Sequence, residues 1–365
     1  MIEKDKIIID NTTVFTGIES VKLCDKKLNE IVLDCKNNVV LFTSSGQLKR
    51  GTPFNCTEFA KIIVCQPNPD LDFLDNVISE LKRIRPSYII AFGGGSVIDS
   101  AKVASVFLFS DISLNEYFRN IHCKKTIFSK RCHLICIPTT SGTGAEITPF
   151  ATVWDRKNEV KRSFACNLLE PDFIYLDPGV TLTAPKELTI FCAMDACSHA
   201  LESLWNKNMT DISFKYAIES LKLISCNLMP LLNDLNNVCY RAKIQLSSFY
   251  SGCAIRITRT AIAHSISYPI TLKYNVPHGL ACSFTLKKII DCVTKNQLWN
   301  KQIPTDLIEN ISNLISAIDL DSYLKQYCSK SDIINLIDKM NTVGRADNFI
   351  VDNFIVDNFK LRDLL

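Results

Sequence analysis

Four side chains in the second half of the chain have the chemistry of metal ligands. Asp195 and His199 lie four residues apart in AMDACSHALE, a stretch with helical periodicity, so both should point from one helix face about one turn apart. His264 and His278 follow in TAIAHSISY and YNVPHGLA. One carboxylate and three imidazoles suit Fe(II) or Zn(II), whereas calcium and magnesium prefer more oxygen ligands. Spacing alone does not show that the distant histidines converge, so unrelated core or surface histidines remain the alternative.

A glycine-rich turn lies in the first half, in RPSYIIAFGGGSVIDSAKVAS. The pattern predicts a buried strand, then Gly93, Gly94 and Gly95, then a helix that begins near Ser96 as its N-cap. Glycines can take positive φ and let the backbone approach a ligand, and the free N–H groups of a helix start attract an anion such as a pyrophosphate. Asp99 is expected in the first helical turn, where a carboxylate suits the helix dipole. A strand–helix turn without a ligand is the alternative, because this is not a GxGxxG fingerprint.

A second polar turn follows another predicted strand, in IPTTSGTGAEITPFATVWD. Thr139, Thr140 and Ser141 stand there beside Gly142 and Gly144. Such hydroxyls and glycines suit contacts to a phosphate, a ribose or a nicotinamide amide, although a plain loop has the same composition. Ligands of open α/β sheets bind at the carboxyl ends of strands, so two such turns together favour a dinucleotide site.

The elements that must position these residues change in kind along the chain. Short β-branched runs first alternate with amphipathic stretches such as LDFLDNVISELKRI, which predicts a mostly parallel sheet with helices on both faces. After about Pro185 the segments have helical periodicity instead. We therefore expect an α/β dinucleotide-binding domain over residues 1–182 and an all-α metal-binding domain over residues 183–365. The candidate strands are 7–9, 39–43, 61–65, 88–92, 133–137 and 173–176.

Composition narrows the class of protein. The 365 residues are 47% hydrophobic with a net charge of +3, and no basic stripe predicts binding to nucleic acid. No apolar run reaches membrane-spanning length, and the start MIEKDKIIID does not resemble a secretory signal, so we expect a cytoplasmic enzyme with buried free cysteines. The oligomeric state is not fixed by the sequence, which is compatible with a homodimer. Near the end, NFIVD at 348–352 repeats at 353–357, and we assign this duplication no function.

Five motifs in order carry a resemblance to a known family: GGGSVIDSAK, PTTSGTGAEIT, YLDPGVTLTAPKELT, MDACSHALES and HSISYPITLKYNVPHG. Together they resemble the iron-containing (group III) alcohol dehydrogenases. The resemblance implies an N-terminal dinucleotide domain and an all-helical C-terminal domain. It also implies that the metal ligands are Asp195, His199, His264 and His278, and that Thr139, Thr140 and Lys161 join the turn at 93–96 in binding the cofactor.

Two departures from the family pattern affect the expected chemistry. Many members carry a further histidine four residues after the third ligand, where this chain has Tyr268. A tyrosine hydroxyl can relay a proton but is a poorer base at neutral pH. Many members also end their second strand in an acidic residue that excludes NADP, where this chain has Ser44. Without that carboxylate, NADPH is acceptable as well as NADH.

Within the family, the strings TPFATVWD, WNKN, TRTAIAHSISYPIT and PHGLACSFTL most resemble phosphonoacetaldehyde reductases. The resemblance implies reduction of phosphonoacetaldehyde to 2-hydroxyethylphosphonate. Arg259, five residues before His264, would suit the phosphonate, with Arg256 one turn earlier. Two arginines on a solvated helix face are the alternative. A general alcohol or polyol dehydrogenase, a cyclising enzyme of the same broad fold and a degenerate nucleotide sensor are the rival functions.

Overall fold

The computed structural model of the chain describes residues 5–22, 24, 26, 30, 38–54, 59–120, 128–158, 160–341, 344–350 and 364. The chain divides into two compact units. Unit 1 comprises residues 1–140 and 145–183, and unit 2 comprises residues 141–144 and 184–365. The boundary expected after residue 182 lies beside this division, but the short excursion at 141–144 was not predicted.

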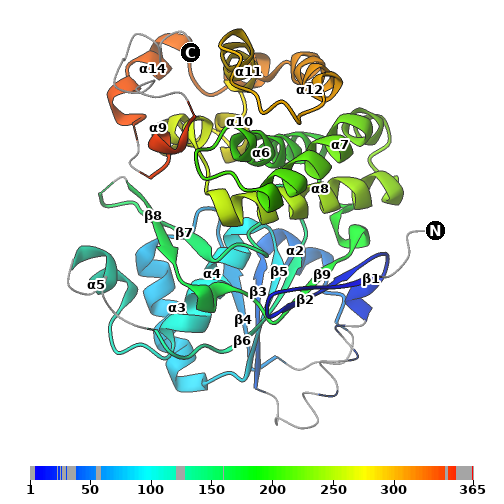
Figure 1. Cartoon of the computed structure of the whole chain (residues 1–365). Helices are drawn as coiled ribbons and strands as arrows, with labels where there is room; N and C mark the ends of the chain where they lie inside the picture. The colour runs from blue at the N-terminus through cyan, green and yellow to red at the C-terminus, as the bar shows by residue number, and fades with distance from the viewer. Residues whose placement is uncertain are drawn as a thin grey trace. The chain divides into compact units, whose positions relative to one another are not determined.

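Unit 1 is built on a seven-stranded sheet with the order β1-β2-β9-β6-β5-β3-β4 (Figure 1). Neighbouring strands run parallel except for β1 and β2. The central strands are continuous apolar runs because both of their faces are buried. All six predicted strands are present, while β2 was missed. The strands are β1 (Asp5–Ile9), β2 (Thr12–Thr16), β3 (Val39–Ser44), β4 (Lys61–Cys65), β5 (Tyr88–Gly93), β6 (His133–Pro138) and β9 (Phe173–Leu176).

Helices and one hairpin complete unit 1. The longest helix, α3, begins after Asp70, whose side chain accepts a hydrogen bond of 2.8 Å from the N–H of Phe73. Its buried residues recur every three or four positions, which is the amphipathic pattern predicted for this stretch. The antiparallel hairpin of β7 (Phe150–Asp155) and β8 (Val160–Ala165) was not predicted. The helices are α2 (Ser45–Arg50), α3 (Leu71–Ile84), α4 (Gly95–Phe107), α5 (Leu114–Arg119), η2 (Asn167–Leu169) and η3 (Pro178–Thr181).

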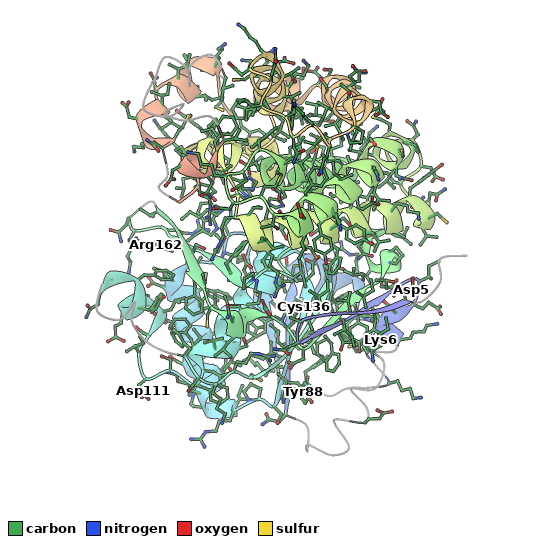
Figure 2. All side chains as sticks on the ribbon, in the orientation of Figure 1. Asp5, Lys6, Tyr88, Asp111, Cys136 and Arg162 are labelled. Carbon is green, nitrogen blue, oxygen red and sulfur yellow. The ribbon has the colours of Figure 1, made fainter. Side chains whose placement is uncertain are left out.

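Two residues labelled in Figure 2 make contacts between neighbouring strands of unit 1. One contact lies at the amino ends of β5 and β6, and the other lies within the β7–β8 hairpin. Tyr88 at the start of β5 stacks on His133 of β6, with 4.9 Å between ring centroids. Arg162 of β8 pairs with Asp155 of β7 across 3.0 Å. His133 therefore belongs to the amino end of the strands, opposite to the edge where a ligand is expected.

Unit 2 is helical, as predicted, and the α/β and all-α fold classes of the two units are confirmed. Its α6, α7 and α8 pack on one another, and Ser220 of α7 donates a hydrogen bond of 2.9 Å to the carbonyl of Ser247 in α8. Pro185 precedes α6, in line with its predicted place at a helix start. The helices are α6 (Lys186–Leu204), α7 (Asp211–Asn233), α8 (Val238–Thr258), α9 (Ile262–Tyr274), α10 (His278–Ala281), α11 (Leu286–Lys295), α12 (Thr305–Ile318), α13 (Leu320–Leu324), α14 (Lys330–Ile334), η4 (Ile337–Lys339) and η5 (Ala346–Asn348).

Three expectations from composition can be compared with these elements. None of the described helices combines the length and the apolar character that crossing a bilayer requires. The described cysteines are free thiols, and most of them are buried. The second copy of the repeated NFIVD unit falls outside the described residues, whereas Phe349 of the first copy is buried against Trp205, with 6.2 Å between ring centroids.

Candidate metal centre and cofactor-binding edge

Asp195 and His199 lie on α6, one turn apart. The Nε2 atom of His199 is 3.6 Å from Oδ1 of Asp195, so the spacing of four residues places both groups on one helix face. Nearly every residue of α6 after Thr189 is buried, and the two side chains are almost wholly removed from water. A buried carboxylate and a buried imidazole are costly unless they have partners, which makes this helix face a candidate ligand site.

His264 of α9 and His278, the first residue of α10, approach the same carboxylate. Nε2 of His264 lies 3.4 Å from Oδ1 of Asp195. Its ring stacks on His199 at 4.7 Å between centroids and meets His278 at 5.2 Å. The ligand atoms of Asp195, His264, His278 and Cys282 all lie within 4.8 Å of one another. The structure thus brings three of the four expected ligands into the span of one ion, with His199 beside them.

The donor atoms fit a divalent cation. Among the described residues, the buried Nε2 of His264, which faces Asp195, makes no hydrogen bond. A buried polar atom without a hydrogen bond lowers the free energy of unfolding by about 1–3 kcal/mol. A metal ion bound to the lone pair of the imidazole nitrogen would remove that cost. Imidazoles together with a carboxylate are the donors that Fe(II) and Zn(II) take in proteins.

Glu202, which sequence reasoning missed, holds His264 in place. Its Oε2 lies 2.5 Å from Nδ1 of His264, and its Oε1 accepts a hydrogen bond of 3.1 Å from the backbone N–H of the same residue. A carboxylate that accepts a hydrogen bond from Nδ1–H leaves the lone pair of Nε2 free to bind a metal ion. The sequence did contain a pattern that could have identified Glu202. Asp195, His199 and Glu202 stand at positions i, i+4 and i+7, which lie on one face of a helix.

The charges around this cluster also favour a cation. Burial raises the pKa of Asp195, but His199, His264 and His278 outweigh it and hold that pKa below its usual range. Burial lowers the pKa of His199 to about 4, which leaves a neutral imidazole. Burial also lowers the pKa of His264, but Glu202 and Asp195 overcome that effect and raise it. Two buried carboxylates thus draw positive charge to the position that a metal ion would take.

The predicted cofactor residues of unit 1 meet at one edge of its sheet. β5 lies between β3 and β6, and the register pairs Gly93 with Pro138. The backbone N–H of Thr139 donates to the carbonyl of Gly93 at 3.0 Å, and Ser44 is the last residue of β3. The carboxyl ends of these strands, where ligands of such sheets bind, therefore carry Ser44, the turn at 93–96, Thr139 and Thr140.

The details of the glycine turn differ from expectation in two respects. The N-cap of α4 is Gly94, not Ser96, whose Oγ instead accepts a hydrogen bond of 3.2 Å from the N–H of Asn68. Neither Gly93, Gly94 nor Gly95 has a positive φ. The reason for glycine is space: a Cβ on Gly93 would lie 2.5 Å from Cγ2 of Val97, and one on Gly94 would lie 3.1 Å from Oγ1 of Thr140.

Asp99 does not lie in the first turn of α4, so the prediction that its carboxylate interacts with the helix dipole there is wrong. Its Oδ2 accepts a hydrogen bond of 2.9 Å from the N–H of Thr152, and its Oδ1 lies 3.9 Å from Nζ of Lys102. Lys102 is fully buried and donates to the carbonyls of Ala145 at 2.8 Å and Thr148 at 2.7 Å. The two charged side chains thus anchor the segment that leads into β7.

Two further expected cofactor contacts lie away from the glycine turn in the chain. Lys161 is on β8, where its Nζ stands 5.8 Å from the ring centroid of Trp154. Ser141 belongs to the excursion into unit 2, where a Cβ on Gly142 would lie 2.6 Å from the carbonyl oxygen of Cys192 and one on Gly144 would lie 2.5 Å from Cα of Gly252. Glycine is thus required for this segment to pack against α6 and α8.

Comparison with known proteins decides the family. The model of iron-containing alcohol dehydrogenases matches residues 16–178, and the model of the C-terminal part of the same family matches residues 189–358. This chain belongs to the iron-containing alcohol dehydrogenase family. The matched ranges include the cofactor-binding edge of unit 1 and every expected metal ligand of unit 2.

Two curated relatives of this chain are named as reductases. A sulfoacetaldehyde reductase of Bilophila wadsworthia is 31% identical over 219 residues, which are 60% of this chain and 56% of the relative. A phosphonoacetaldehyde reductase of Streptomyces viridochromogenes is 29% identical over 214 residues, 58% of this chain and 54% of the relative. The matches thus span about half the length of these curated relatives.

A solved structure supports the fold. The sulfoacetaldehyde reductase of Bifidobacterium kashiwanohense, in complex with NAD+, superposes with a TM-score of 0.80 over 98% of this chain and 96% of that one. The sequence identity is 21%, so this likeness concerns the fold alone.

Tyr268 lies beside the expected metal ligand His278 and contacts Arg345, which in turn lies near Arg259. The ring of Tyr268 stacks on His278 at 6.3 Å between centroids, and its hydroxyl accepts a hydrogen bond of 3.3 Å from Nε of Arg345. Arg259 was expected on a helix but ends α8 with a φ of 65°, which is strained for any residue with a side chain. Arg345, which was not predicted, is close enough to Arg259 to lower the pKa of that guanidinium, after the larger effect of burial.

Hydrogen bonds fix the segment that brings the two arginines together. Asn348 of η5 donates to the carbonyl of Thr260 at 2.9 Å, and Asn206 donates to the carbonyl of Arg259 at 3.2 Å. The segment at 344–350 is thereby tied to the turn between α8 and α9. Two guanidinium groups within electrostatic reach of each other repel, and an anion placed with them would relieve the repulsion.

Proposed function

We propose that this chain reduces a small anionic aldehyde to the primary alcohol with NADPH or NADH, with phosphonoacetaldehyde as the substrate and 2-hydroxyethylphosphonate as the product. The observation that carries the proposal is the cluster of buried Asp195 and His264 with half-buried His278, whose donor atoms lie within the span of one ion. Family membership supports the reaction class, and the two reductase relatives support an aldehyde with an acidic group.

Asp195, His199, His264 and His278 would hold Fe(II) or Zn(II), which supplies Lewis-acid polarisation of the aldehyde carbonyl when bound. Glu202 keeps His264 in the tautomer that binds through Nε2. Burial of the cluster keeps water away from its charges and strengthens their electrostatic effect on the reacting carbonyl. Tyr268, stacked on His278, is placed to pass the proton that the alkoxide product requires.

Residues of unit 1 would bind the cofactor. The backbone N–H groups at the start of α4 and the hydroxyls of Thr139 and Thr140 suit the phosphates and polar groups of a dinucleotide. Lys161 adds a positive charge. Ser44 replaces the carboxylate that would repel a 2′-phosphate, so both NADPH and NADH are accepted.

Arg259 and Arg345 would bind the anionic end of the substrate. A phosphonate carries up to two negative charges and three oxygens, so it can pair with both guanidinium groups. A sulfonate has similar geometry but only one negative charge. Because the two arginines already repel each other, we propose that the doubly charged phosphonate is the better substrate.

A substrate comparison tests this proposal. Initial rates are measured with phosphonoacetaldehyde, sulfoacetaldehyde and propanal, each with NADPH and NADH, in protein loaded with Fe(II) or Zn(II). The expected order of kcat/KM is phosphonoacetaldehyde, then sulfoacetaldehyde, then propanal. Faster reduction of propanal would refute the anionic substrate. Oxidation of glycerol without reduction of these aldehydes would favour a polyol dehydrogenase, and tight nucleotide binding without any turnover would favour a sensor.

A further inference from the structure

Cys282 is brought to the metal cluster by the close approach of α10 to α6. It follows α10 four residues after His278, and its backbone N–H donates to the carbonyl of His278 at 2.9 Å. A Cβ on Gly279 would lie 2.0 Å from the carbonyl oxygen of Phe191, so only glycine allows this approach. Ser198 of α6 donates to the carbonyl of Cys282 at 3.1 Å and fixes the approach.

The thiol of Cys282 points at the shared carboxylate. Its Sγ lies 3.1 Å from Oδ1 of Asp195, and the residue is fully buried. Its sulfur is one of the four ligand atoms that lie within 4.8 Å of one another, together with those of Asp195, His264 and His278. Zinc binds nitrogen and oxygen at about 2.0–2.2 Å and sulfur at about 2.3 Å, so two donors of one ion are at most roughly 4.5 Å apart. Shifts of a few tenths of an ångström would satisfy that limit.

A second observation points to a ligand in the same place. Among the described residues, the buried Nε2 of His264 makes no hydrogen bond, although it faces the same Oδ1 of Asp195 at 3.4 Å. The carboxylate oxygen, the imidazole nitrogen and the thiol therefore converge. Protons on the thiol and the imidazole can partly neutralise Asp195, but a cation bound by all three groups would satisfy each of them.

We propose that the sulfur of Cys282 is a ligand of the metal ion, in addition to Asp195, His199, His264 and His278. The inference rests on the proposed metal-dependent function and extends its ligand set. On binding, the S–H bond breaks, its proton leaves to solvent, and a sulfur–metal bond forms while the sulfur keeps both bonding electrons. A thiolate makes the donor set softer, which favours Zn(II) or Fe(II) over Mn(II) and Mg(II).

The alternative is that Cys282 only donates a hydrogen bond to Asp195. Cobalt(II) separates the two cases, because a thiolate ligand gives an intense sulfur-to-cobalt charge-transfer absorption that carboxylate and imidazole ligands lack. Metal-free full-length protein is titrated with Co(II) under anaerobic conditions, and its electronic spectrum is followed. We expect this absorption in the native protein and in Cys197→Ala, and its loss in Cys282→Ser and Cys282→Ala.

Cys197 is the matched control, since it is a fully buried thiol of α6 between Asp195 and His199 in the sequence. The measurement on the native protein needs no variant, so a Cys282 variant that does not fold leaves the test intact. Stoichiometric Co(II) binding without the charge-transfer absorption in the native protein would overturn the proposal, as would its persistence in Cys282→Ser.

Proton release gives a second readout. Calorimetric titration with Zn(II) in buffers of different ionisation enthalpy should show about one more proton released per ion by the native protein than by Cys282→Ser. The dissociation constant for Zn(II) should rise at least about tenfold in that variant. Equal proton release and equal affinity would overturn the proposal for Cys282. Failure of the native protein to bind Zn(II) or Co(II) at all would instead contradict the proposed metal-dependent function.

Discussion

The candidate metal centre of unit 2 consists of side chains, whereas the candidate cofactor edge of unit 1 consists mainly of backbone groups and hydroxyls. Asp195, His264 and His278 come from α6, α9 and α10, and each contributes one donor atom to the cluster. At the cofactor edge, adjacent strands end together, and glycine serves mainly to leave space. A single substitution should therefore abolish metal binding at the metal centre. At the cofactor edge it should only change the preference between NADPH and NADH.

The largest effect is expected from removal of a metal ligand. Asp195→Ala or His278→Ala should lower kcat/KM by about a thousandfold or more, equivalent to about 4 kcal/mol, because the carbonyl is no longer polarised. Metal content after gel filtration should fall with activity, while nucleotide affinity stays nearly unchanged because most of the proposed cofactor residues lie in unit 1. Asp291→Ala, which removes an exposed aspartate paired with Lys287, is the control. An active, metal-free Asp195→Ala protein would contradict the assignment of Asp195 as a ligand of a metal that turnover requires.

A smaller loss of metal affinity is expected from substitution of Glu202, which contacts the proposed ligand His264 and not the metal itself. Glu202→Gln should weaken metal binding by about 10- to 100-fold, because the amide orients His264 less firmly than the carboxylate does. Turnover should recover in large part at saturating metal, which a merely unfolded variant would not do. Glu219→Gln, at an exposed glutamate that pairs with Lys222, should bind metal normally. Unchanged metal affinity in Glu202→Gln would show that His264 does not need this partner.

Loss of either Arg259 or Arg345 should slow the reduction of an anionic aldehyde but not of an uncharged one. Arg259→Ala and Arg345→Ala should each lower kcat/KM for phosphonoacetaldehyde by about 10- to 100-fold, since a charge-assisted hydrogen bond contributes about 1.5–3 kcal/mol. Reduction of propanal should stay nearly unaffected, because that aldehyde never makes the contact. Arg256→Ala, one helical turn before Arg259, is the matched control. Equal losses on both aldehydes would mean that the arginines are structural.

The smallest effect is expected at the cofactor edge. Ser44→Asp should lower kcat/KM with NADPH by about tenfold through like-charge repulsion and change the value with NADH little. The substitution should leave the fold intact, because Ser44 is the N-cap of α2 and aspartate is an equally good N-cap. A native protein that strongly prefers NADH would contradict this interpretation of Ser44.

The sequence predicted those features that depend on local patterns. Continuous apolar runs identified the central strands, because strands buried on both faces contain little else. The spacing of four residues placed Asp195 and His199 on one face of α6. Strand β2 and the β7–β8 hairpin were missed, since their short runs mix polar and apolar residues.

Features that depend on tertiary approach could not be predicted. Cys282 meets Asp195 only because Gly279 lets α10 come close to α6. Arg345 reaches Tyr268 from a distant segment that Asn348 ties to Thr260. The glycine turn was located correctly, but the positive φ expected of its glycines was wrong, because contacts with Val97 and Thr140 are not visible in a linear sequence.

Turnover should require the divalent ion that the clustered side chains of unit 2 are proposed to hold. The most direct measurement removes the metal with a chelator and then adds Fe(II) or Zn(II) stepwise, while bound metal and NADPH-dependent reduction of phosphonoacetaldehyde are recorded together. We predict no turnover in the metal-free protein and a linear return of activity up to about one ion per chain. Full activity in protein shown to contain no metal would contradict the account.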